Sequence, residues 1–173
     1  MATSKAKTKS GKPRIPPLSI KNAKLVYRNF SGTAKKFNAK GLRNFHVLLE
    51  PEIAKSLEQD GWNIKWPKPR DDGEERNSTL KVRVRFDNFP PTIIMMTARG
   101  RSELDEETVS LLDTAEIENC DLKIVGSYNE LETGWKGFTA YLSQLGVVLS
   151  ENDIMSKYMD IKPNKKSIDE EDD

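Results

Sequence analysis

The sequence predicts a mainly β protein, built as a small antiparallel barrel with two or three short helices. Short runs of β-forming residues recur along the 173-residue chain, and nine prolines and ten glycines provide turns between them. The run 80–86 alternates strictly between apolar and basic residues. The hydrophobic content of 36% is enough for one core but not for two. A closed barrel would also leave no strand edge unpaired.

The first strands are predicted in the basic N-terminal part of the chain. Residues 1–17 are rich in Lys, Ser, Thr and Pro without periodicity, so we expect a disordered basic arm. Residues 18–30 predict one strand, and residues 42–50 predict a second. The turn-like segment 31–41 would join them as a hairpin with a basic connection.

A short helix is predicted over residues 51–60. Pro51 suits the first turn of a helix, and Glu52 favours the positive end of the helix dipole. Gly61 suits the C-terminal stop. The helix would therefore separate the first hairpin from the strands that follow.

Two predicted strands follow the helix, and each carries different residue types on its two faces. In the short strand 62–66, Trp62 and Trp66 fall on the face opposite Lys65. Strand 79–86 has apolar residues on one face and a row of cations on the other. Such a row repels itself unless an anion lies across it. The cations of this row are Lys81, Arg83 and Arg85.

The C-terminal half completes the predicted domain, which spans residues 18–160. Residues 92–98 predict a strand buried on both faces, followed by a turn at 99–101. Residues 104–113 predict one or two helical turns with Asp105 as the cap. The remaining predicted elements are a strand at 120–129, a strand or strand pair at 134–150, a short helix at 151–159 and a disordered acidic tail at 161–173.

The net charge of +1 conceals a strong asymmetry along the chain. Residues 1–49 contain 12 Lys and Arg and no Asp or Glu, whereas all 27 acids lie in residues 50–173. This asymmetry suggests a segment that binds a polyanion and an acidic tail that interacts with other groups. The tail ends in five consecutive acids, Asp169, Glu170, Glu171, Asp172 and Asp173.

The sequence lacks the usual signatures of an enzyme. His46 is the only histidine and Cys120 the only cysteine, so these residue types cannot build a zinc site or an intrachain disulfide. We expect Cys120 to be a small buried hydrophobe. No glycine motif for phosphates or dinucleotides is present, and no run is long enough to span a membrane. We therefore expect no enzyme activity, no cofactor, no metal and no membrane contact.

A cluster of acids leaves one enzymatic alternative open. The cluster of Glu103, Asp105 and Glu106 could hold Mg²⁺ in a metal-dependent nuclease. A solvated helix start, favoured by the helix dipole, explains the same cluster more simply.

Cations and aromatic residues interleave in a pattern typical of proteins that bind single-stranded nucleic acid. Cations along a groove neutralise phosphates, and unpaired bases stack on aromatic faces for about 1–3 kcal/mol each. An aromatic residue in a strand is more often part of the core, and we expect Phe45, Phe86 and Tyr141 there. The candidate binding residues are Tyr27, Arg28, Phe30, Lys35, Lys36, Phe37, Arg43, Trp62, Lys65, Trp66, Lys81, Arg83 and Arg85.

The order of several motifs resembles a group of bacteriophage single-stranded DNA-binding proteins of the podophage type. The motifs are GLRNFHVLLEPEIAKSLEQDGWNIKW, LKVRVRF, PPTIIMM, LDEETVSLLDTAEIENCDLKI and GFTAYLSQLGVVLSENDIMSKY. The resemblance covers about residues 18–160 and the acidic character of the tail. It implies an OB-fold core that binds single-stranded DNA without sequence preference, in phage DNA replication or recombination, in the cytoplasm of the bacterial host.

The resemblance also implies two roles for the acidic tail. The tail would occupy the DNA-binding groove when DNA is absent, and it would contact replication proteins such as the phage DNA polymerase. Tails of this class commonly end in an aromatic residue, whereas this chain ends in Asp173, which favours the first role. The sequence leaves open an RNA-binding OB-fold protein, a DNA-mimicking interaction module, and whether the protein forms a homodimer.

Overall fold

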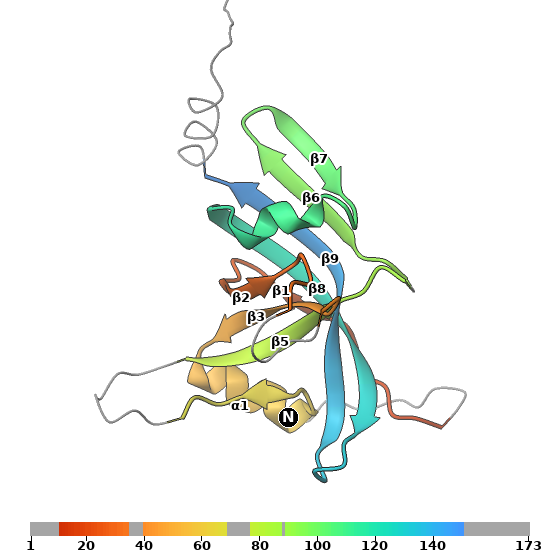
Figure 1. The fold of residues 1–173 in the computed structure, drawn as a ribbon. Helices are drawn as coiled ribbons and strands as arrows, with labels where there is room; N and C mark the ends of the chain where they lie inside the picture. Colours follow the sequence, from red (N-terminus) through yellow and green to blue (C-terminus); the bar gives the residue numbers. More distant parts are fainter. Residues whose placement is uncertain (1–10, 35–39, 69–76, 88, 151–173) are drawn as a thin grey trace, which may run out of the picture.

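A computed structural model of the protein describes residues 11–34, 40–68, 77–87 and 89–150. Nine strands within these ranges form one sheet, accompanied by one α-helix and one 3-10 helix (Figure 1). The elements are β1 (Leu18–Ile20), β2 (Leu25–Asn29), β3 (Arg43–Leu49), α1 (Pro51–Asp60), β4 (Ile64–Lys65), β5 (Ser78–Val84), β6 (Thr92–Thr97), β7 (Gly100–Leu104), η1 (Val109–Asp113), β8 (Ile117–Glu130) and β9 (Lys136–Leu149).

The sheet encloses one core without closing into a complete barrel. Its main strand order is β1-β8-β9-β5-β3-β2, with β4 added on β5 and the β6–β7 hairpin added on β9. β5 and β6 run parallel to β9, and the other pairs are antiparallel. The predicted mainly β, OB-fold-like class is confirmed. The expectation of a closed barrel is wrong, because the sheet stays open between β2 and β8.

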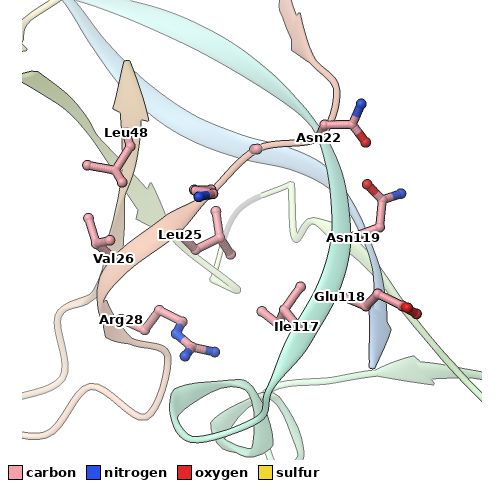
Figure 2. A pocket seen from close by; sticks show the side chains of 10 residues that line it. Asn22, Leu25, Val26, Arg28, Leu48, Ile117, Glu118 and Asn119 are labelled. Carbon is pink, nitrogen blue, oxygen red and sulfur yellow. The ribbon is translucent and has the colours of Figure 1, made fainter. Parts of the chain in front are cut away.

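A pocket of about 460 Å³ fills this opening (Figure 2). Leu25 and Val26 line it from β2, and Ile117 lines it from β8. At one end of the opening, the N–H of Ala23 donates a hydrogen bond to the carbonyl of Cys120 at 2.8 Å. Beyond that bond, the two strands diverge and the sheet ladder is interrupted.

The other end of the opening is held by a side chain from each side. Figure 2 shows the Arg28 side chain extending from β2 toward β8. Its Nη1 donates hydrogen bonds to the carbonyls of Leu112, at 2.9 Å, and Ala115, at 2.6 Å. In return, the carboxylate of Asp113 accepts hydrogen bonds from the N–H groups of Phe30 and Ser31. These charge-assisted bonds replace the missing strand pairing at this end.

The predicted helix is confirmed as α1. Its first residue is Pro51, and Gly61 ends it in the left-handed conformation at φ 110°. The N–H of Gly61 donates to the carbonyl of Glu58 at 3.0 Å, which satisfies one of the last helical carbonyls. The strand predicted at residues 62–66 is shorter in the structure, where β4 comprises Ile64 and Lys65.

The predicted strand over 18–30 is divided in two. Asn22 has a φ of 54° between β1 and β2. β1 pairs with β8, whereas β2 pairs with β3 in the predicted hairpin. The first half of the predicted strand therefore belongs to the β8 side of the sheet and the second half to the β3 side, with the bend at Asn22 between them.

The region of β6 and β7 differs from the sequence prediction. β6 was expected to be buried on both faces, which is wrong: Ile93 is buried, but Met96 is 43% exposed. The predicted turn at 99–101 is shifted, and Gly100 already begins β7. Four of the five residues of β7 are exposed, so its sequence carries no apolar alternation that would indicate a strand.

Trp62 belongs to the core of the domain. It is 3% exposed, and its ring lies 6.2 Å from that of Phe138. Two glycines of the β8–β9 pair make room for this packing. A Cβ on Gly126 would lie 3.0 Å from the Trp62 ring, and a Cβ on Gly137 would lie 2.4 Å from the carbonyl oxygen of Gly61. A side chain at Gly126 would therefore crowd the Trp62 ring, and a side chain at Gly137 would clash with the backbone just before Trp62.

Candidate nucleic-acid interface

The row of cations predicted on β5 is confirmed in position. Lys81, Arg83 and Arg85 alternate with the buried residues of β5, so they point outward. The sheet register places His46 opposite Lys81, and Tyr141 beside Arg83. We call the outer surface around this row the β5 face. It comprises Tyr27, His46, Lys65, Lys81, Arg83, Arg85 and Tyr141.

Two tyrosines flank the row of cations. Tyr27 is 69% exposed, and its ring stands edge-on to that of His46 with a centroid distance of 5.3 Å. The backbone of Tyr27 has a φ of 51° within a register shift of β2. Tyr141 lies on the other side, with the guanidinium carbon of Arg85 at 5.8 Å from its ring centre. In the strand order β9-β5-β3-β2, the cations therefore lie between the two rings.

The position of Tyr141 corrects a sequence prediction. It was expected in the core, but it is only half-buried and lies on the outer side of β9. Its neighbours Ala140 and Leu142 are the buried residues of that stretch. Alternation along β9 was the signal that could have placed Tyr141 on the same face as Arg83.

Arg85 of the β5 face pairs with Asp87, but ion pairs leave the other cations of this face unneutralised within the described residues. Burial and the charges of Lys81 and Lys65 lower the pKa of His46 to about 4. Burial and the charges of Arg83 and Lys65 likewise lower the pKa of Lys81. Lys65, Lys81 and Arg83 form no ion pair with another residue in the described part of the chain. A bound anion would relieve this repulsion.

A groove of about 470 Å³ continues from the C-terminal end of β5. Two of its cations are held by acids. Arg85 lies 2.9 Å from the carboxylate of Asp87, and Arg43 lies 3.6 Å from that of Glu106. Arg43 also donates a hydrogen bond to the carbonyl of Phe30 at 2.6 Å. Both cations line the groove, where a phosphate could compete with the carboxylates.

Several candidate residues are not brought to the β5 face. Phe30 is fully buried and stacks on Phe45, so its ring is not open to a base. Trp62 is equally a core residue, and Arg28 spans the opening beside β8. We therefore assign these three candidates to the stability of the fold. Residue type and spacing in the sequence do not reveal which face of the sheet each side chain occupies.

The remaining candidates lie beside the face or outside the described residues. Trp66 is 41% exposed, but it follows β4, and its Nε1–H donates to Glu58 at 2.8 Å. Phe86 is packed against the core and lies under the guanidinium of Arg43. The residues outside the described ranges are Lys35, Lys36 and Phe37, the predicted helix at 151–159, and the tail acids Asp169, Glu170, Glu171, Asp172 and Asp173.

The acidic cluster and the single cysteine were the other candidate sites of chemistry in the sequence. They contain no group of three or more His, Cys, Asp or Glu side chains arranged to hold a metal ion. Asp105 accepts hydrogen bonds from Thr108, which lower the pKa of its carboxyl. Burial raises the pKa of Cys120 to about 12, in keeping with the predicted small buried hydrophobe. The helices found in this part of the chain are all too short or too polar to cross a bilayer.

His46 makes folding stability depend on pH. The pKa of His46 in the folded protein is about 4, below its ordinary value of 6.5. Between these two pH values, the unfolded chain is protonated at His46 and the folded protein is not. We expect this contribution to be complete above pH 6.5 and to be lost as the pH falls toward 4. Urea unfolding of the wild type and His46→Gln across this range measures it. If the free energy of unfolding of His46→Gln falls as much as that of the wild type between pH 6.5 and about 5, His46 is not the source of the pH dependence.

Comparison with known proteins gives the chain a family. Residues 7–173 match the family model described as "Putative phage ssDNA-binding domain". Curated protein sequences yield no match. The solved single-stranded DNA-binding protein from bacteriophage Enc34, as a C-terminal truncation, is similar with a TM-score of 0.51 at 13% identity, over 78% of this chain and 86% of that chain. This similarity concerns the fold.

Two further solved structures show weaker likeness. The Enc34 protein without that truncation gives a TM-score of 0.46 at 13% identity, over 80% of this chain and 81% of that chain. Bacteriophage T7 gp2.5, a single-stranded DNA-binding protein, gives 0.40 at 9% identity, over 88% of this chain and 98% of that chain. Because the family match extends over nearly the whole sequence, the protein belongs to this family of phage single-stranded DNA-binding domains.

Proposed function

We propose that the protein binds single-stranded DNA without sequence preference across the β5 face, during phage DNA replication or recombination. The observation that carries this proposal is the row of Lys81, Arg83 and Arg85 between two outward-facing tyrosines. The cations meet phosphates, and the rings of Tyr27 and Tyr141 meet unpaired bases. Every nucleotide offers a phosphate and a π-face, so this arrangement supports binding without base readout.

The proposed function requires only that the cations and aromatic rings of the β5 face are held in position to bind DNA. It involves no catalytic step, metal or cofactor, and it operates in the cytoplasm of the bacterial host. Lys35, Lys36 and Phe37 come shortly before Gly41 and Arg43, two residues of the groove, in the sequence. We include them as further contacts to the same strand.

A titration with labelled oligo(dT) tests the proposal. Affinity should fall steeply with salt, because each neutralised phosphate releases counterions and adds about −0.7 to the logarithmic salt slope. Duplex DNA of the same length should bind more weakly, and a matched RNA strand tests the role of the 2′-hydroxyl. Equal affinity for duplex, or binding that ignores salt, would overturn the proposal.

The acidic tail is proposed to compete with DNA for the groove and to contact replication proteins such as the phage DNA polymerase. Deletion of residues 169–173 should then strengthen oligo(dT) binding several-fold at low salt, where charges are least screened. A variant with Asn and Gln in place of the five acids keeps the chain length and should behave like the deletion. If both variants bind as the wild type does at low salt, the tail does not compete.

A further inference from the structure

A second groove lies on the outer side of the sheet, where β9 leaves β5 and pairs with β6. Its volume is about 600 Å³. Gly146 of β9 and Ile94 of β6, which are paired in the sheet, form its floor together with Met96. A Cβ on Gly146 would meet nothing within 4 Å, so the space above the floor is open.

The rim of the second groove is basic. It carries Lys21, Lys123 and Arg101, and none of these forms an ion pair within the described residues. The acid in the lining is Asp121, whose Oδ1 accepts a hydrogen bond from the N–H of Asn22 at 3.0 Å. The lining therefore contains three cations and one carboxylate, and that carboxylate already accepts a hydrogen bond. The net positive charge of the lining favours an anionic ligand.

Strand β9 connects the second groove with the β5 face. Tyr141 borders the β5 face where β9 pairs with β5, and Gln144 lines the second groove where β9 pairs with β6. Tyr141 and Gln144 are three positions apart along the strand, which corresponds to a distance of about 10 Å. A polyanion that leaves the β5 face past Tyr141 reaches the basic rim directly.

We infer that the second groove holds the continuation of the same DNA strand, so that the binding track extends beyond the β5 face along β9. This inference rests on the proposed function and deepens it. Lys21, Lys123 and Arg101 contact phosphates, and the apolar floor packs against sugars and bases. The described lining contains no aromatic ring, so the contribution is electrostatic rather than stacking.

The inference predicts an effect that depends on DNA length. Lys123→Ala combined with Arg101→Ala should weaken binding of an oligo(dT) of about 20 nucleotides roughly 10-fold, and its salt slope should become less negative by about 1.4. An oligo(dT) of about five nucleotides, enough for the β5 face alone, should bind as it does to the wild type. Anisotropy titrations of both lengths at several salt concentrations measure this.

Two further variants make the test independent of general charge and of folding. Lys55→Ala with Lys136→Ala removes two exposed cations elsewhere and should leave both lengths unaffected. Gly146→Glu adds an acid in open space and should weaken only the long oligonucleotide. Equal effects on both lengths, or none on the long one, would overturn the inference. If the proposed function itself fails, the wild type will bind neither length.

Discussion

Replacement of Lys81 and Arg83 by alanine is expected to weaken binding of a short oligo(dT) by about 10- to 100-fold at low salt. Each substitution removes a cation from the centre of the β5 face, and a hydrogen bond to a charged group contributes about 1.5 kcal/mol or somewhat less after screening. The logarithmic salt slope should become less negative by about 1.4, because two phosphates keep their counterions. Anisotropy titration over a range of salt concentrations gives both quantities.

The same double variant should fold at least as well as the wild type. Burial, together with the positive charges of Arg83 and Lys65, lowers the pKa of Lys81, so the charged form of Lys81 is disfavoured in the folded protein. Urea unfolding should therefore show unchanged or increased stability, which separates lost binding from lost structure. The matched control is Lys55→Ala with Lys136→Ala. An unchanged affinity and salt slope in the Lys81 and Arg83 variant would place the DNA elsewhere.

Tyr27→Ala and Tyr141→Ala are each expected to weaken binding by about 5- to 150-fold, corresponding to about 1–3 kcal/mol of stacking. Their salt slopes should stay at the wild-type value, because no cation is lost. A variant that loses a phosphate contact would also bind more weakly, but its salt slope would become less negative.

Conservative variants sharpen the tyrosine test. Tyr27→Phe and Tyr141→Phe keep the aromatic ring and should retain most of the affinity. Trp66→Ala serves as a control, since Trp66 is exposed but lies away from the row of cations and bonds to Glu58. If the Phe variants lose as much affinity as the Ala variants, stacking is not the role of these rings.

The strand that carries the site could be predicted because its pattern is simple. Side chains alternate between two faces of a strand, and one face of β5 is buried, so the apolar residues fix the direction of Lys81, Arg83 and Arg85. The helix α1 was equally predictable, because Pro51 and Gly61 mark its two ends through backbone geometry. Both predictions depend only on neighbouring residues.

Other parts of the site depend on contacts between distant residues. Arg28 is of a residue type that often contacts DNA, yet its hydrogen-bond partners Leu112 and Ala115 lie more than 80 residues away in the sequence. Trp62 is buried because Gly126 and Gly137 leave room for it and for the adjoining backbone. No local pattern around Arg28 or Trp62 reveals such partners, so residue type suggested the wrong environment for both.

Photo-cross-linking of a bromodeoxyuridine oligonucleotide to the full chain tests the central claim most directly. Base stacking on the β5 face predicts adducts at Tyr27 and Tyr141, identified by mass spectrometry of the digested protein, and their loss at high salt. Adducts confined to exposed aromatic residues away from this face, such as Phe89 in the β5–β6 connection, would contradict the account.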